Sequence, residues 1–182
     1  KPYVVSPENK MPFAFDYEGR NTLGADRLAN VAAAYAYYSS NAVVTDFGTA
    51  LKFCVLHEGC YEGGVIAPGL GASMAALAQK TAKLPQIALN KRSSALGKNT
   101  VESLKSGAYF GWRGMLREIL QELTSAPAND LGFSPLVIAT GGISSELGFA
   151  EEFFDVVDKN LTLRGIYSLY QEHKGYGSAI LK

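Results

Sequence analysis

Six stretches of the chain are apolar and rich in β-prone residues, which is the pattern of short or half-buried β-strands. The expected strands are 3–6, 13–17, 42–46, 50–56, 60–66 and 135–140. Three of them follow one another directly, and His57-Glu58-Gly59 supplies a turn between the last two of these. The first half of the chain therefore predicts an antiparallel meander.

Five other stretches repeat apolar residues every three to four positions, as helices with one buried face do. The expected helices are 25–38, 70–82, 99–124, 144–157 and 163–173. In the longest, Gly107, Gly111 and Gly114 each cost about 1 kcal/mol relative to Ala. We therefore expect another helix to approach closely there, within the subunit or across a dimer. The order of elements predicts an α/β or α+β domain with helices on a mixed sheet.

Composition and charge narrow the class of protein. The chain has 182 residues, 47% of them hydrophobic, and its 17 Lys and Arg balance 17 Asp and Glu. Zero net charge argues against nucleic acid as a partner, because neutralising phosphates needs a basic excess. The longest apolar stretch, 31–38, is far shorter than the roughly 20 residues that cross a bilayer, and no leader-like segment opens the chain. We expect a soluble, cytoplasmic protein without a membrane partner.

Two blocks carry candidate chemistry. Gly24-Ala25-Asp26-Arg27 places an acid beside a base where a helix is expected to begin, although an acid in the first turn also simply suits the helix dipole. Asp46-Phe47-Gly48-Thr49-Ala50 ends a strand with an acid and continues into a glycine turn with a hydroxyl. Such a turn can cradle phosphate oxygens while the carboxylate holds a cation; the alternative is an ordinary Asx turn.

Together with further glycine-rich boundaries, these blocks resemble the type III pantothenate kinase family of the actin-like kinase superfamily. The resemblance covers residues 17 to about 170. It rests on Leu23-Gly24-Ala25-Asp26-Arg27, Asp46-Phe47-Gly48-Thr49-Ala50, Tyr61 with Gly63-Gly64, Ile66 with Pro68-Gly69-Leu70, Thr81-Ala82-Leu84-Pro85, Gly97 with Thr100, Ser106-Gly107, and Ala139-Thr140-Gly141-Gly142.

The resemblance implies an α/β fold of the actin-like ATPase or ribonuclease-H-like type, with a mixed sheet and helices on its faces. It implies ATP-dependent phosphorylation of pantothenate to 4'-phosphopantothenate, the first step of coenzyme A biosynthesis. It also implies a homodimer that uses ATP with Mg2+ and a monovalent cation, K+ or NH4+.

The resemblance assigns roles to individual residues. Asp26 matches the catalytic base, and Arg27 matches the residue that meets the substrate carboxylate. Chemistry agrees, because an alcohol must lose its proton during phosphoryl transfer and a guanidinium binds a carboxylate through a charge-assisted fork. The other matches are substrate-binding Tyr17, Gly24, Ala25 and Thr100, ATP-binding Gly48, Thr49, Gly141 and Gly142, and Asp46 as the ligand of the monovalent cation.

One departure from the family pattern concerns the extent of the chain. The family grips ATP phosphates with an Asp-x-Gly-Asn-Thr loop in its first lobe, and the sequence contains no such motif. We therefore expect residues 1–22 to be a remnant of the first lobe or of the junction between lobes. Residues 23–182 would form the second lobe, which binds substrate and dimerises. The chain would then be an incomplete portion of the enzyme with weak or no turnover by itself.

The other departure follows Thr49-Ala50, where the family usually has threonines and then an acid, whereas this chain has Leu51, Lys52 and Cys54. From strand alternation we favour Lys52 as a solvated residue that points away from the site. The sharper alternative is that its ammonium replaces the monovalent cation. These departures leave open a non-catalytic, pantothenate-kinase-like regulatory or accessory homologue. A third alternative is a sugar kinase of the same superfamily, which would share the phosphate chemistry but would give no reason for Arg27 to stand beside the base.

Overall fold

A six-stranded mixed sheet forms the centre of the computed structural model, which describes residues 2–81, 84–87, 94–125, 133–142 and 150–176. The strands are β1 Ala14–Phe15, β2 Ala42–Phe47, β3 Ala50–His57, β4 Cys60–Pro68, β5 Leu136–Thr140 and β6 Val156–Val157. Their order in the sheet is β1-β4-β3-β2-β5-β6. The expected meander is confirmed, because β2, β3 and β4 pair antiparallel; β1, β5 and β6 join in parallel.

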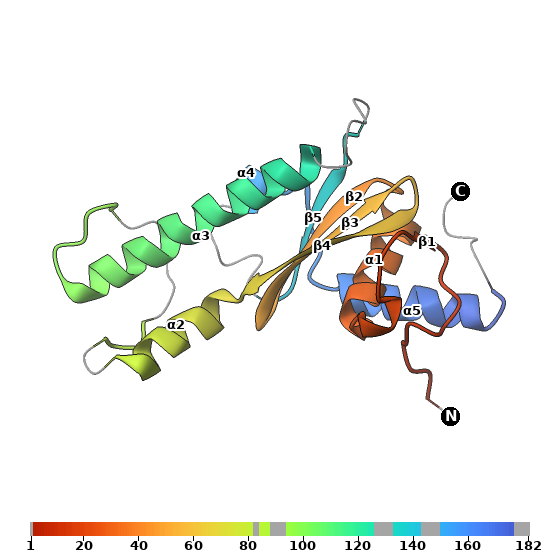
Figure 1. Cartoon of the computed structure of the whole chain (residues 1–182), viewed down its shortest axis with the longest axis horizontal. Coiled ribbons are helices and arrows are strands. Elements are labelled where there is room, and N and C mark those ends of the chain that lie inside the picture. The colour runs from red at the N-terminus through yellow and green to blue at the C-terminus, as the bar shows by residue number, and fades with distance from the viewer. Residues whose placement is uncertain (1, 82–83, 88–93, 126–132, 143–149, 177–182) are drawn as a thin grey trace.

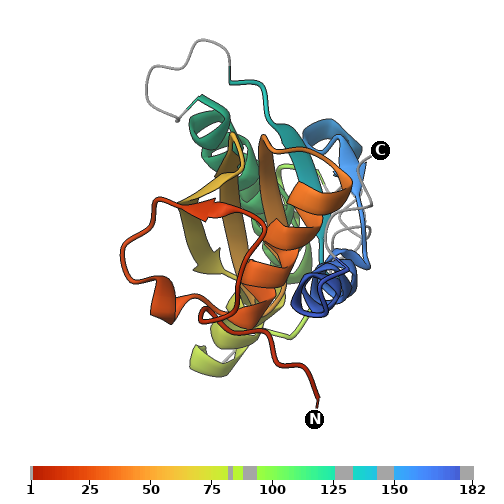
Figure 2. The ribbon, with the colours of Figure 1, turned by 90° about the vertical axis from the view of Figure 1, so that its right-hand side faces the viewer.

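Helices cover both faces of this sheet. They are a 3-10 turn at Arg20–Thr22, α1 Ala25–Tyr37, α2 Leu70–Lys80, α3 Thr100–Ser125, α4 Ala150–Phe153 and α5 Leu161–His173. Figures 1 and 2 show α1 and α5 side by side on one face and α3 on the other. In Figure 1, α2 and the first half of α3 extend beyond the end of the sheet. None of the helices in the described ranges is long and apolar enough to cross a membrane.

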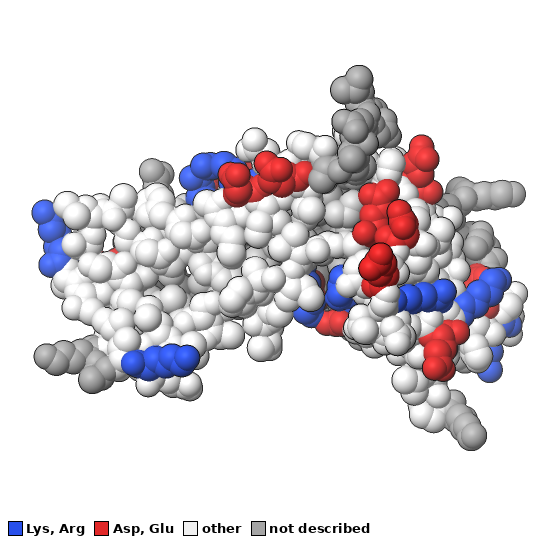
Figure 3. Space-filling view, in the orientation of Figure 1, with Lys and Arg blue, Asp and Glu red and all other residues white. Residues whose placement is uncertain are grey.

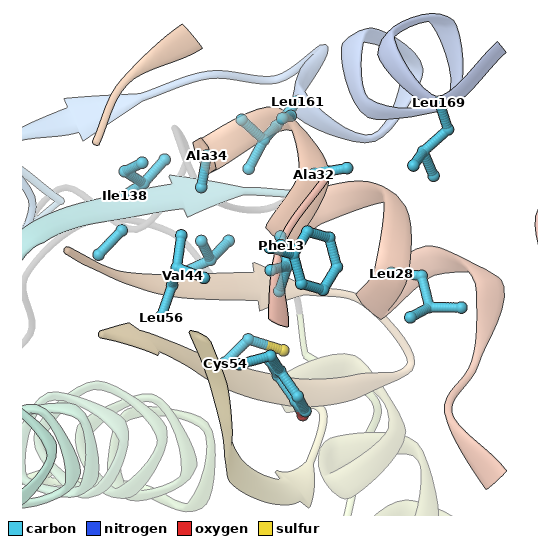
Figure 4. Close-up of a cluster of buried hydrophobic side chains, with 14 of the residues drawn as sticks. Phe13, Leu28, Ala32, Ala34, Val44, Cys54, Leu56, Ile138, Leu161 and Leu169 are labelled. Atoms are coloured by element: carbon cyan, nitrogen blue, oxygen red, sulfur yellow. The ribbon is translucent and has the colours of Figure 1, made fainter. Parts of the chain in front are cut away.

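Two cores form because alternate residues of each strand face opposite sides of the sheet. The core under α1 and α5 is drawn in Figure 4 and includes Leu28, Ala32, Val44, Cys54, Leu56, Ile138, Leu161 and Leu169. The core under α3 includes Val43, Phe47, Leu51, Phe53, Trp112, Leu116 and Leu120. The polar residues discussed below lie on the first of these two faces, near the start of α1.

Gly165 allows α5 to lie directly against α1. A Cβ at this position would fall 1.7 Å from the carbonyl oxygen of Ala29, a distance that no side chain tolerates. The close packing of the two helices fixes the position of α1, and with it the residues at its N-terminal end.

Two sequence predictions of secondary structure are wrong. Residues 3–6 form no strand, because Tyr3 packs instead on the α5 side chains Tyr170 and His173, with ring centroids 5.9 and 5.1 Å away. The helix expected over 144–157 extends too far toward the C-terminus. The observed helix α4 ends at Phe153, and Val156–Val157 instead forms strand β6, which pairs in parallel with β5. Residues 143–149 of that expected helix, and Ala82 of the family motif, lie outside the described residues.

The glycines of α3 also differ from expectation. A Cβ added at Gly107, Gly111 or Gly114 would meet no atom within 4 Å among the described residues. The prediction that another helix of the same subunit approaches them is therefore wrong for this part of the chain. Close approach across a dimer stays a prediction.

Candidate functional site

The site is built around the first turn of α1. Gly24 precedes the helix with extended backbone, at φ −63° and ψ 146°, and as the N-cap residue it provides no side-chain hydrogen bond. Asp26 Oδ1 instead accepts a hydrogen bond of 2.8 Å from the backbone N–H of Arg27. The Asp26 side chain remains 44% exposed, which leaves a carboxylate at the positive end of a helix and within reach of solvent.

Lys52 connects Asp26 to the sheet. Lys52 and Asp46 are direct partners on the antiparallel strands β3 and β2, so their side chains share one face. The Lys52 ammonium forms an ion pair with Asp26 and a second one of 3.3 Å with Asp46 Oδ2. The favoured interpretation from sequence, a solvated Lys52 that points away from the site, is therefore wrong. The register of β2 and β3 directs this side chain under α1.

Asn30 completes the cluster of Asp26, Lys52 and Asp46, and the sequence analysis did not predict it. Its Nδ2 donates to Asp46 Oδ2 at 3.3 Å, and its Oδ1 accepts a 2.7 Å hydrogen bond from Thr162 Oγ1 of α5. Asn30 is 2% exposed. The signal that could have revealed it is a polar residue one turn after Asp26, in the middle of the apolar face of α1.

Asp26 and Lys52 stabilise each other's ionised form. Burial opposes ionisation of Asp26, but hydrogen bonds from Lys52 and from the Arg27 amide, with the charge of Lys52, outweigh it and lower its pKa. Burial likewise opposes the charge on Lys52, yet its hydrogen bond to Asp26 and the charge of Asp46 raise its pKa. Asp26 is therefore a carboxylate and Lys52 an ammonium at neutral pH.

Arg27 points into the sheet instead of toward this cluster. The residue is 8% exposed, its guanidinium donates a hydrogen bond to the Tyr61 hydroxyl, and the rings of Tyr17 and Tyr61 flank it at 5.6 and 5.7 Å. Its Nε has no hydrogen-bond partner within the described chain. The predicted substrate-binding residues Tyr17 and Arg27 thus lie together.

The described side chains that contact the Arg27 guanidinium supply no negative charge. Burial raises the pKa of the Cys54 thiol and of the Tyr61 hydroxyl, so both neighbours are neutral at pH 7. No Asp or Glu among the described residues forms a salt bridge with Arg27. A buried cation without a counter-charge is costly, and a carboxylate ligand would relieve that cost.

A second group of predicted residues meets at the carboxyl ends of β2 and β5. Asp46 pairs with Thr140 in parallel register, so both strands end at the same edge of the sheet. Gly48 and Thr49 form an exposed turn there. Gly141 follows β5 with φ 96°, and its missing Cβ would lie 2.5 Å from the Phe47 carbonyl oxygen. The structure therefore brings these ATP-binding candidates together beside the Asp46 carboxylate, and Gly142 follows them as an exposed residue.

The start of α2 adjoins the same turn. The Gly69 N–H donates to the Thr49 carbonyl at 3.0 Å, and a Cβ on Gly69 would fall 2.2 Å from that oxygen. Only glycine permits this contact. The N-terminal, positive end of α2 is thereby held against the Gly48-Thr49 turn.

Thr100 is not brought to the site. It begins α3 just after Asn99, whose Oδ1 caps the helix by accepting the N–H of Glu102 at 2.9 Å. Figure 1 places this end of α3 at the opposite end of the molecule from α1. Within one chain, Thr100 therefore stands apart from Asp26 and Arg27.

A hollow of about 380 Å³ opens beside Asp26. Its walls come from the N-terminal segment, from Ala25 at the start of α1, and from Thr162 and Ile166 of α5. Arg27 does not line it. The partly exposed Asp26 carboxylate is consequently accessible from this hollow, whereas the Arg27 guanidinium is buried against the rings of Tyr17 and Tyr61.

The six-stranded mixed sheet and the helices on its two faces define an α/β protein, which is the architecture expected of the actin-like ATPase fold. The sequence profile of the type III pantothenate kinase family matches residues 1–122, which is more than half of the chain. The chain belongs to this family.

Three solved structures are similar to this chain over most of its length, and the first of them, with a TM-score above 0.5, supports the fold. A conserved protein from Campylobacter jejuni, described as a Baf family transcriptional activator, aligns over 90% of this chain and 69% of its own, with 23% identity and a TM-score of 0.59. An activator of 2-hydroxyisocaproyl-CoA dehydratase from Clostridium difficile, with bound ADPNP, aligns over 83% and 68% at 11% identity and a TM-score of 0.43. Component A of (R)-2-hydroxyglutaryl-CoA dehydratase from Acidaminococcus fermentans aligns over 82% and 69% at 16% identity and 0.39.

Proposed function

We propose that this chain carries the pantothenate-binding part of an enzyme that phosphorylates pantothenate to 4'-phosphopantothenate with ATP, the first step of coenzyme A biosynthesis. The observation that carries the proposal is a buried Arg27 guanidinium, without an acidic partner in the described chain, that directly follows in sequence a residue with an accessible carboxylate, Asp26. Pantothenate has a carboxylate for the first and a primary alcohol for the second. Residues 23–182 form the substrate-binding lobe in this proposal, and residues 1–22 belong to the junction with a first lobe.

In this proposal Arg27 binds the substrate carboxylate through its unpaired Nε–H and the adjacent guanidinium edge, between the rings of Tyr17 and Tyr61. Burial strengthens such a charge-assisted bond because water competes weakly there. Gly24 and Ala25, which are exposed at the start of α1, leave the backbone open to the rest of the substrate.

Asp26 receives the proton of the substrate hydroxyl. Its lowered pKa keeps it ionised at neutral pH, so it can orient the hydroxyl by accepting its hydrogen bond and take the proton as the phosphoryl group arrives. A strong base is not needed, because the hydroxyl loses its proton late, when its oxygen already bonds to phosphorus.

ATP with Mg2+ supplies the phosphoryl group when bound. The residues at the ends of β2 and β5 suit a nucleotide phosphate: the Thr140 hydroxyl is buried without a hydrogen-bond partner in the described chain, and the Gly48-Thr49 turn is exposed beside the N-terminal end of α2. Backbone N–H groups at such a helix start attract phosphate oxygens. Gly141 and Gly142 would then approach the adenosine.

A homodimer would bring Thr100 to the site. An apolar groove of about 440 Å³ runs between α2 and α3 and includes Leu77, Gly107, Gly111 and Trp112. Figure 3 shows few charged side chains over this end of the molecule. If a second copy packs its own α2 and α3 into this groove, its helices would approach Gly107 and Gly111 closely. Thr100 of one copy would then reach the substrate of the other.

Calorimetric titration tests the substrate assignment with two ligands that differ only at one end. Pantothenate carries the carboxylate, and pantothenol replaces it with a neutral alcohol. We expect pantothenate to bind and pantothenol to bind at least about tenfold more weakly, because one charge-assisted hydrogen bond contributes about 1.5–3 kcal/mol. Equal affinities, or no binding of pantothenate by a folded chain, would reject the proposal. Binding of pantothenate by a complete enzyme that never transfers phosphate would favour the accessory homologue.

A further inference from the structure

The monovalent cation implied by the family does not fit the residues present at Asp46. Asp46 Oδ2 already accepts two hydrogen bonds of 3.3 Å, one from the Lys52 ammonium and one from Asn30 Nδ2. Asp26, the other carboxylate of this cluster, is bonded to the same ammonium. An added cation would have to compete with a charge that is covalently attached to the neighbouring strand.

We propose that Lys52 is the built-in monovalent cation of this site, so that the chain binds neither K+ nor NH4+ at Asp46. The role of this charge in phosphoryl transfer rests on the function proposed above. That Lys52 takes the place of the cation at Asp46 does not depend on that function. One ammonium carries the same single positive charge as K+, and the antiparallel register of β2 and β3 places it opposite Asp46 and under Asp26.

Burial makes this internal cation effective. The side chains of Lys52 and Asp46 are only 18% and 14% exposed, so dissolved salt screens their interaction weakly. Asn30, held by Thr162 of α5, fixes the Asp46 carboxylate in the orientation that Lys52 meets. The cluster therefore holds its positive charge at any concentration of potassium.

Lys52 can also contact the nucleotide. An ammonium has three N–H donors, and its contacts within the described chain engage two carboxylates, Asp26 and Asp46. The remaining donor is available to a phosphate oxygen at the Gly48-Thr49 turn, which begins two residues beyond Asp46 on the same strand end. Lys52 would thus add a direct phosphate contact to its role as counter-ion.

Thermal unfolding in matched salts tests this inference without any substrate. The 182-residue chain is melted in KCl from 0 to 200 mM, with choline chloride keeping the ionic strength constant. We expect the melting temperature of the natural chain to change by less than about 1 °C, because no specific site for K+ exists. In Lys52→Thr the two carboxylates lose their counter-charge and acquire a cation site, so saturating K+ raises the melting temperature by about 3 °C or more.

Two further variants separate the ammonium's charge from general destabilisation. Lys52→Arg keeps a cation and should remain indifferent to K+, and Lys159→Thr removes an exposed lysine and should also remain indifferent. Saturable, K+-specific stabilisation of the natural chain overturns the inference, whether or not the variants fold. A folded Lys52→Thr that ignores K+ overturns it as well.

Pantothenate titration of the same samples keeps the two proposals apart. If the natural chain ignores K+ but does not bind pantothenate, the proposed function fails and the internal cation stands. If it binds pantothenate and K+ strengthens that binding several-fold over choline, the function stands and the internal cation fails.

Discussion

Replacing Arg27 by Met should strengthen the fold and weaken the binding of pantothenate. Arg27→Met keeps a long side chain of similar shape and removes the charge. Most substitutions of a residue that is 8% exposed destabilise a protein. This one should do the opposite, because the guanidinium is buried between two tyrosine rings with an unpaired Nε and no carboxylate partner in the described chain.

The expected magnitudes follow from two opposing contributions. Replacing buried ionic groups by apolar ones of similar volume stabilises proteins by about 1–4 kcal/mol. Against this stands the lost hydrogen bond to the Tyr61 hydroxyl, about 1 kcal/mol, although that hydroxyl keeps its contact with Cys54. The net effect of Arg27→Met is an increase of about 0–3 kcal/mol in the free energy of unfolding. Losing a charge-assisted bond to the ligand weakens pantothenate binding by about 10- to 150-fold.

Urea unfolding and calorimetric titration measure the two quantities on the same protein. Arg20→Met is the matched control: Arg20 is exposed, lies 4.2 Å over the Phe15 ring and donates to the Asn9 carbonyl, so its loss should leave pantothenate affinity unchanged. The reasoning is refuted if Arg27→Met unfolds more than about 1 kcal/mol more easily than the natural chain. An affinity that stays within about twofold would refute the binding role of Arg27.

Three other substitutions test the remaining parts of the argument. In a complete enzyme, Asp26→Asn should slow phosphoryl transfer by roughly 10²- to 10⁴-fold in single-turnover assays while pantothenate affinity is largely kept; a smaller loss would place the base elsewhere. Because folding lowers the pKa of Asp26, its stabilising contribution is present above the unfolded pKa near 3.9 and disappears as pH falls through the folded value. Urea midpoints between pH 5 and 2 should therefore fall more for the natural chain than for Asp26→Asn, and parallel curves would contradict this. Gly165→Ala should cost about 3 kcal/mol in urea unfolding, since its Cβ would collide with the Ala29 carbonyl, whereas Gly71→Ala in α2 meets no described atom within 4 Å and should gain about 0.5–1 kcal/mol. Similar effects of the two glycine substitutions would refute the close packing of α1 and α5.

Local patterns predicted those elements whose periodicity is strong. The meander of β2, β3 and β4 and the helix α1 were expected within one or two residues of their observed ends, because alternation of period two and repeats of 3.6 residues are encoded in neighbouring residues. The same patterns failed at residues 3–6 and at Val156–Val157. There, packing of Tyr3 on α5 and pairing of β6 with β5 decided the outcome, and both contacts join residues far apart in sequence.

The residues of the candidate site also fall into those that the sequence predicted and those that only the fold revealed. Its residue types, including Asp26, Arg27 and Asp46, were recognisable from motifs, because such chemistry depends on which side chains are present. Asn30 was not, since an amide on an apolar helix face gains a role only when β2 brings Asp46 beneath it.

The sequence by itself determined the fold class, the family and the main candidate residues, all of which depend on local pattern and motif identity. Only the tertiary structure decided that Lys52 turns inward to join Asp26 and Asp46, that Arg27 is buried without a counter-charge in the described chain, and that Thr100 lies far from both. The physical reason is that strand register and helix packing set the distance between charges. Whether a lysine acts as a solvated surface group or as an internal cation depends on that distance and on its burial.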